Sequence, residues 1–185
     1  MLAAAVELIA MQGFSATTLE QVGLRAGYSR GLVTQRFGSK EGLIEVLVEQ
    51  LHQHFNELLD VSGINLLPGL DATIAYLDIY LSNLENSETT MRAYHVLVSE
   101  SIGVLPGIRA TFVASKTRTT QRLRTLIERA QQEGTVRPEL DAGAAADMAT
   151  GLLMGLTLEW LLDPSTDLPR IRKVVLETTR RTLSG

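Results

Sequence analysis

The chain has 185 residues, of which 45% are hydrophobic and 21% charged, so it can bury a sizeable core and wholesale disorder is excluded. It contains no cysteine, which excludes disulfides and thiolate metal sites. The net charge is −4, but residues 1–40 hold four basic side chains against two acidic ones and sum to +2, which leaves −6 for the remainder.

The N-terminal segment is apolar and has helical spacing. Leu2, Val6 and Ile9 recur at steps of four and three, so they line one face of a first helix. The segment has no basic leader and contains Glu7, which argues against a signal peptide. Gly13 is expected to end this helix, and the residue that follows it, Phe14, can pack back into the core.

Two short helices and a long one are expected next. Thr17 and Glu20 fit a capping box that starts a second helix, which runs to about Ala26. Gly27 fits the left-handed position that stops a helix, and Ser29 can cap a third helix that ends near Phe37. After Gly38, Ser39 caps a long fourth helix that ends around Asp60. Its apolar stripe is Leu43, Leu47, Leu51, Phe55 and Leu58.

Five further helices are predicted, and no segment shows the alternation of a strand. Their approximate ranges are 70–84, 88–102, a long helix between Pro106 and Gly134, 142–162 capped by Asp141, and 169–183. The predicted fold is all-α, with an N-terminal three-helix head (residues 1–45) and a C-terminal bundle of about six helices (residues 46–185).

The pattern of residues 18–37 predicts a helix-turn-helix, in which two short helices are joined by a tight turn that contains glycine. Small residues are needed where the helices cross, and Gly23, Ala26 and Gly27 supply them. Val33 and Phe37, four apart, supply apolar anchors on the inner face. The outer face carries polar side chains that suit base edges and phosphates, namely Arg30, Thr34, Gln35 and Arg36.

Here the sequence resembles the TetR/AcrR family of bacterial regulators. The resemblance covers roughly residues 2–47 and rests on Thr17-Thr18, Val22-Gly23, Ala26-Gly27-Tyr28-Ser29-Arg30-Gly31 and Phe37-Gly38-Ser39-Lys40-Glu41-Gly42-Leu43. Residues 133–141 also look like a loop common in the family's C-terminal domain. The chain begins inside the family's usual first helix, so the sequence leaves open whether residues precede Met1 in the native chain.

The resemblance implies a homodimer that binds double-stranded operator DNA and is released by a small-molecule effector, most often as a repressor. The third helices of such a dimer enter major grooves about 34–36 Å apart. Carried over residue by residue, Arg30, Gly31 and Gln35 lie where the family meets bases. The whole DNA-binding set is Thr18, Ser29, Arg30, Gly31, Thr34, Gln35, Arg36 and Lys40. The family usually has tyrosine at position 34 and often histidine at position 36.

The resemblance also implies a dimer made by the last two long helices. The interface residues expected from it are Met148, Leu152, Gly155, Val174, Val175 and Thr178. Several aromatic side chains and one histidine in residues 46–185 fit two roles. They either pack in the core or line a ligand cavity, since such cavities are mostly apolar. They are Phe55, Tyr76, Tyr80, Tyr94, His95, Phe112 and Trp160.

Two other functions remain open. One is a ligand- or protein-binding helical dimer with a weakened or vestigial DNA-binding head, because Thr34 reaches less far than tyrosine. The other is an enzyme, which we do not expect, because the sequence has no glycine-rich phosphate loop, zinc spacing or nucleophile elbow.

No cofactor or metal is expected, since His52 and His54 are two apart and do not share a helix face. No apolar run approaches the ~20 residues that span a bilayer, so we expect a cytoplasmic protein without membrane contact.

Overall fold

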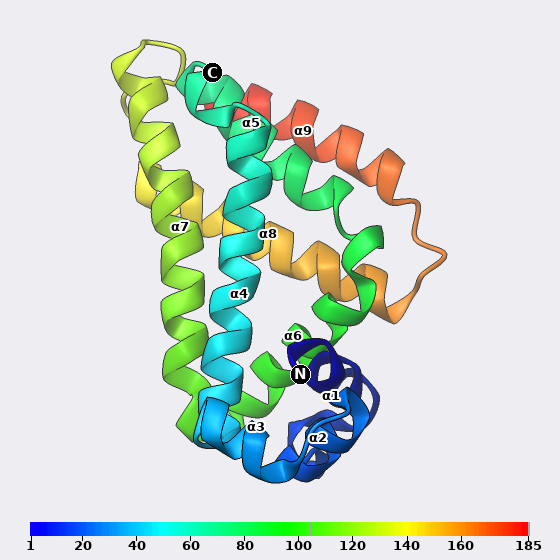
Figure 1. The fold of residues 1–185 in the computed structure, drawn as a ribbon. Coiled ribbons are helices and arrows are strands. Elements are labelled where there is room, and N and C mark those ends of the chain that lie inside the picture. The colour runs from blue at the N-terminus through cyan, green and yellow to red at the C-terminus, as the bar shows by residue number, and fades with distance from the viewer. Residues whose placement is uncertain (104, 185) are drawn as a thin grey trace. The chain divides into compact units, whose positions relative to one another are not determined.

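The computed structural model of the chain describes residues 1–103 and 105–184. Within these ranges it is built of nine α-helices and three short 3₁₀ segments, without strands (Figure 1). The helices are α1 (Leu2–Ala16), α2 (Leu19–Ala26), α3 (Arg30–Phe37), α4 (Lys40–Val61), α5 (Gly69–Ser82), α6 (Glu88–Ile102), α7 (Arg109–Gln132), α8 (Ala142–Leu162) and α9 (Leu168–Ser184). The predicted all-α fold, with three helices followed by six, is confirmed.

The contacts divide the chain into two compact units. Unit 1 contains residues 1–54 and 87–115, and unit 2 contains residues 55–86 and those from 116 onward. The boundaries fall inside α4, inside the 3₁₀ segment Glu85–Ser87 and inside α7. Unit 1 therefore includes α6, because α6 packs on α1. The expected division at residue 45, between the three-helix head and the C-terminal bundle, concerns function and not contacts. It stays a prediction.

The first helix is interrupted at Gly13, whose backbone angles are φ 79° and ψ 168°. Glycine is favoured at this positive φ because it has no Cβ. Phe14 follows the break and is only 3% exposed, within an apolar cluster that also holds Ile44 and Leu97. The predicted burial of Phe14 is confirmed, whereas Gly13 breaks α1 rather than ending it, because the helix resumes after the break and runs to Ala16.

The capping box of α2 lies one residue later than predicted. Thr18, not Thr17, is the N-cap: its hydroxyl accepts the Gln21 amide at 3.1 Å, and Gln21 Oε1 accepts the Thr18 amide at 2.8 Å. Thr17 is buried and donates its hydroxyl to the carbonyl of Gly13 at 2.7 Å. The prediction was wrong because two adjacent threonines precede the helix and only burial distinguishes them.

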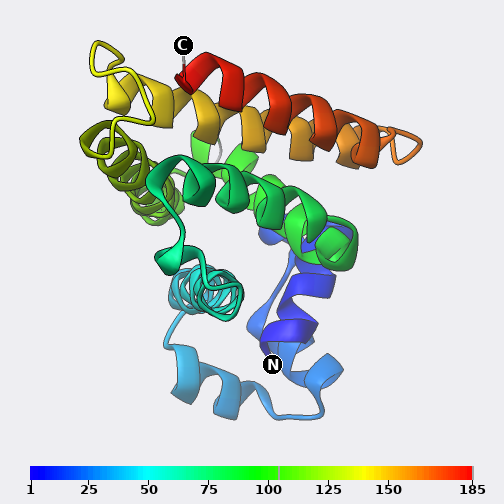
Figure 2. The same cartoon turned by 90° about the horizontal axis from the view of Figure 1, so that it is seen from above.

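In unit 2, two ion pairs join α5 to α9. Asp78 pairs with Arg172 at 2.6 Å, and Asp71 pairs with Arg180 at 2.7 Å. The earlier residue on α5 meets the later residue on α9, so the two helices run in opposite directions, as Figure 2 shows.

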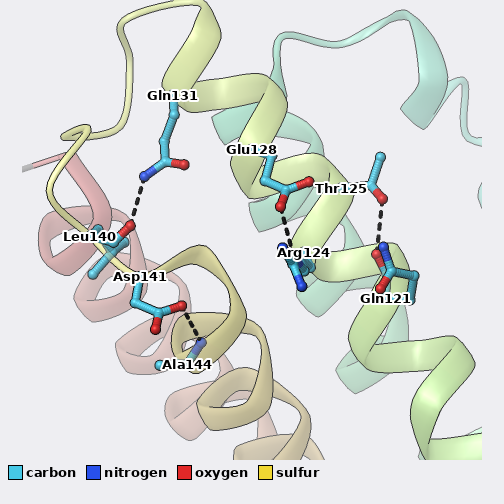
Figure 3. A network of polar contacts seen from close by, with 8 residues as sticks. All are labelled: Gln121, Arg124, Thr125, Glu128, Gln131, Leu140, Asp141 and Ala144. Carbon is cyan, nitrogen blue, oxygen red and sulfur yellow. Dashed lines mark hydrogen bonds and ion pairs between the residues drawn. The ribbon is translucent and has the colours of Figure 1, made fainter.

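Polar contacts shape the connection between α7 and α8 (Figure 3). The side-chain amide of Gln131 donates to the Leu140 carbonyl at 2.8 Å. Asp141 then accepts the Ala144 amide at 3.0 Å and caps α8, as the sequence predicted. On α7 itself, Arg124 and Glu128 form an i,i+4 ion pair of 2.7 Å.

The crossing of α2 and α3 has no room for a side chain at Gly23. A Cβ there would lie 2.8 Å from the Tyr28 carbonyl oxygen and 3.2 Å from Val33 Cγ2. Gly31 differs, because a Cβ there would meet nothing closer than Ser29 Oγ at 3.9 Å.

These two glycines give a matched test of the packing. We expect Gly23→Ala to lower the free energy of unfolding by about 1–3 kcal/mol through overpacking. Gly31→Ala should raise it by roughly 0.5–1 kcal/mol, because alanine favours a helix interior. Urea unfolding followed by circular dichroism measures both, and equal effects of the two substitutions would contradict the crossing geometry.

Candidate nucleic-acid interface

The turn between α2 and α3 follows from local backbone chemistry. Gly27 has φ 75° and ends α2 in the left-handed conformation. The Tyr28 amide returns to the Gly23 carbonyl at 2.8 Å. Ser29 then caps α3 by accepting the Leu32 amide at 3.2 Å. The predicted helix-turn-helix is therefore present with the expected boundaries.

The third helix has one buried face and one exposed face. Val33 is fully buried and Phe37 is 7% exposed, both in a cluster with Ala5, Val22 and Leu43. The other residues of α3 are exposed, namely Arg30, Gly31, Leu32, Thr34, Gln35 and Arg36. The two anchors predicted from the sequence thus orient every predicted polar residue of this helix outward.

Three polar side chains on this exposed face are available to a ligand. Arg30, Thr34 and Gln35 make no side-chain hydrogen bond to any residue that the structure describes. Gln35 also lines a groove of about 550 Å³ beside the start of α1, together with Arg36. The Arg36 guanidinium lies 5.6 Å from the centre of the Phe37 ring.

Three other predicted DNA-binding residues have side chains that form hydrogen bonds within the protein. The hydroxyls of Thr18 and Ser29 cap α2 and α3. The ammonium of Lys40 donates to the carbonyl of Phe14 at 2.7 Å and lies 4.2 Å from the centre of its ring. Burial lowers the pKa of Lys40, an effect opposed by the negative charges of Glu41 and Glu100. A phosphate contact by any of the three stays a prediction.

Of the basic residues in the head, Arg25 is paired. Its guanidinium forms an ion pair of 2.6 Å with Glu7 across α2 and α1. Among the described residues, no carboxylate lies within ion-pair distance of Arg30 or Arg36. The two arginines of the head that have no ion pair among the described residues therefore lie on α3.

The candidate pocket residues form separate groups. In unit 2, the Phe55 ring packs edge-on against Tyr76 and Tyr80 at 5.2 and 5.7 Å between centres. The Tyr80 hydroxyl lies 3.3 Å from the Thr157 hydroxyl, and burial raises the pKa of Tyr76. Trp160 is buried in the same unit.

In unit 1, Tyr94 packs edge-on against Phe112 and His95 at 5.3 and 6.0 Å between ring centres. The Tyr94 hydroxyl also forms a hydrogen bond with the Ser115 hydroxyl. The same Ser115 hydroxyl forms a hydrogen bond of 2.7 Å with Nε2 of His52. Sequence reasoning considered His52 only as a metal ligand and missed this polar group. It joins α4, α6 and α7, and no local signal connects residues so far apart in the chain.

Apolar side chains are exposed on α8, and α9 exposes Val174 among polar and charged residues. Met148 is 54% exposed and Val174 is 56% exposed, and Gly155 and Thr178 are exposed too, while Leu152 is half-buried. Val175 packs inside unit 2 at 8% exposure, which corrects its assignment to an interface, because its side chain is not at the surface. Sequence reasoning missed Leu158 and Leu162, which are exposed on α8.

One described helix, α8, passes the length and hydropathy criteria for crossing a membrane, with a mean hydropathy of 1.2 over its best window. Such a window is also typical of a core helix, and 39% of it is buried in the protein. Asp147 on this helix forms an ion pair of 2.7 Å with Lys116 of α7. These contacts favour a helix that packs within the protein.

Comparison with known proteins gives two family matches. The family model described as "Bacterial regulatory proteins, tetR family" matches residues 1–47. The model described as "BetI-type transcriptional repressor, C-terminal" matches residues 71–184. No curated protein matches the chain.

Several solved structures have the same fold. A protein from Rhodococcus sp. described as a TetR-family transcriptional regulator is 20% identical, with a TM-score of 0.86 over 100% of this chain and 96% of that one. NalD of Pseudomonas aeruginosa, the secondary repressor of the MexAB-OprM multidrug efflux pump, is 24% identical, with a TM-score of 0.78 over 99% and 94%. FadR of Bacillus subtilis, solved with stearoyl-CoA, is 20% identical, with a TM-score of 0.81 over 96% and 95%.

The half-buried His95 predicts a pH dependence of stability. Burial lowers its pKa below the ordinary value of 6.5. As the pH falls below about 6.5, the unfolded chain binds a proton that the folded protein does not, so the folded state loses stability. Urea unfolding over a pH series should show a smaller loss in His95→Gln than in the wild type, and parallel curves would contradict the assignment.

Proposed function

The chain belongs to the TetR family of bacterial transcriptional regulators, and from this we propose that it is a repressor that binds operator DNA as a dimer and is released by a small-molecule effector. The observation that carries the proposal is the exposed face of α3. It bears Arg30, Thr34 and Gln35 without partners among the described residues. Residues 1–45 then form the DNA-binding domain, and residues 46–185 bind the effector and the second subunit in the cytoplasm.

Arg30 and Gln35 read bases in this proposal, and Gly31 lets the helix approach them closely. A guanidinium suits the two acceptors of guanine, and a carboxamide suits adenine, both in the major groove. Thr34, Arg36 and Ser29 contact phosphates, which fix the position of α3 without reading sequence. Thr18 and Lys40 act at the same border of the interface while serving the fold.

The two subunits associate through the exposed faces of α8 and α9. The proposed contacts are Met148, Leu152, Gly155, Val174 and Thr178, extended by Leu158 and Leu162. An exposed apolar surface of this kind is typical of an interface between subunits. Association would cover side chains such as Leu162, which is 76% exposed.

The effector binds in the body among aromatic side chains with few polar groups. Two separate groups have both features, Phe55–Tyr76–Tyr80 in unit 2 and Tyr94–Phe112 with Ser115 in unit 1, and each by itself is a candidate wall of the effector site. Among proteins of this fold, FadR was solved with stearoyl-CoA and NalD represses an efflux pump. Release of the DNA requires that the effector prefer a conformation in which the two α3 helices do not match the operator.

Specificity at the operator tests the base-reading roles. We expect Arg30→Ala and Gln35→Ala each to cost ~1–3 kcal/mol on a duplex selected from a random library and to relax the preference at one base pair. Arg36→Ala should weaken binding to all duplexes alike. It should also reduce the slope of the logarithm of the binding constant against the logarithm of the salt concentration by about 1. Fluorescence anisotropy over a salt series measures both effects.

Arg25→Ala is the control, because it removes the same charge from α2, where Arg25 is paired with Glu7. Shallow salt dependence in the wild type would favour the alternative function, a ligand- or protein-binding dimer with a vestigial head. The internal bonds of Thr18 and Lys40 motivate that alternative.

The dimer surface is tested by placing charge on it. The double substitution of Met148 and Val174 by glutamate should convert the dimer to a folded monomer, because both side chains are exposed within one subunit. Leu66→Glu is the control, since Leu66 is an exposed apolar residue outside α8 and α9. Sedimentation velocity distinguishes the species, and a dimer that survives the double substitution would remove this interface.

A further inference from the structure

Phe14 is the residue at which three helices of unit 1 meet. It follows the break at Gly13, and its ring packs in the cluster that α1, α4 and α6 form together with Ile108 and Phe112. The break also leaves the amides of Phe14 and Ser15 at the start of a new helical turn, where amides lack carbonyl partners within the helix.

Glu100, near the end of α6, supplies those partners. Its carboxylate accepts the Phe14 amide at 3.0 Å, the Ser15 amide at 3.3 Å and the Ser15 hydroxyl at 3.2 Å. An anion at the start of a helical turn is favourable, because unpaired amides point toward it. Gly13 permits this approach, since a Cβ there would lie 2.7 Å from Glu100 Oε1.

The opposite side of the same residue is held from α4. Lys40 donates to the Phe14 carbonyl at 2.7 Å. The negative charge of Glu100 also helps Lys40 to keep its proton against burial. Phe14 is thus held at its amide by a side chain of α6 and at its carbonyl by a side chain of α4.

This arrangement continues directly into the helix-turn-helix. The Phe14 carbonyl also accepts the Thr17 amide at 3.0 Å, and the buried Thr17 hydroxyl bonds to Gly13. The next residue, Thr18, is the N-cap of α2. The start of the recognition unit is therefore fixed by the segment that Glu100 and Lys40 hold.

We propose that Glu100 is a positioning residue for DNA binding, which through the amides of Phe14 and Ser15 fixes the helix-turn-helix against α6. This inference rests on the proposed function, because it assigns Glu100 a role in operator affinity without any contact with DNA. Glu100 is 86 residues from Phe14 in the chain, and its charge has the wrong sign for a phosphate contact.

The test compares Glu100→Gln with Glu45→Gln, an exposed carboxylate on α4. Each substitution removes one negative charge, which by itself favours DNA binding. If Glu100 positions the head, Glu100→Gln should instead weaken binding to a duplex selected by the wild type, by about tenfold, since a carboxamide oxygen replaces only part of the carboxylate's accepting capacity. Glu45→Gln should bind as tightly as the wild type or slightly tighter.

Hydrogen exchange provides the readout that a general loss of stability would not reproduce. In Glu100→Gln the amides of Phe14 and Ser15 should exchange faster, while those of α8 and α9 keep the rate of the wild type. Binding equal to or tighter than that of the wild type would overturn the inference, and so would faster exchange throughout the chain. A wild type that selects no duplex would refute the proposed function itself, and the role of Glu100 in it.

Discussion

The burial of Val33 and Phe37 is the constraint on which the proposed activity depends. These two side chains, one turn apart on α3, fill a cluster with Ala5, Val22 and Leu43 from three other helices. When these two side chains are buried on one side of α3, the opposite side is exposed. Arg30, Thr34 and Gln35 lie on that exposed side. The close approach at Gly23 holds α2 and α3 at the crossing that this burial requires.

Polar groups in the head divide into those that build it and those that remain available. Thr18, Ser29 and Lys40 make hydrogen bonds inside the protein, and Glu100 of α6 bonds to Phe14, the residue that Lys40 also holds. The side chains on the middle of α3 make none with the described residues. A polar side chain that already has an internal partner has fewer donors and acceptors left for DNA. Affinity and specificity for DNA should therefore depend mainly on the exposed side chains of α3.

The body combines ion pairs and apolar contacts in different places. Asp71 and Asp78 tie α5 to α9 through two arginines, so α9 is anchored by charge as well as by Val175 and Leu183. The apolar side chains on the outer faces of α8 and α9 have no such use within the subunit. This separation explains why a helix rich enough in apolar residues to resemble a membrane span fits the proposed role in a dimer.

The sequence by itself determined the helices, most of their ends to within a few residues and the inner face of α3, because helical period, capping residues and glycines act within a few positions of one another. It missed the N-cap at Thr18 and the burial of Val175, because adjacent residues of similar chemistry are separated only by packing. The tertiary structure alone decided that Glu100 meets Phe14, that His52 meets Ser115 and that Lys40 is bound internally. Such contacts join residues 26 to 86 positions apart, and no local preference of the chain encodes which distant side chain will complete a hydrogen bond.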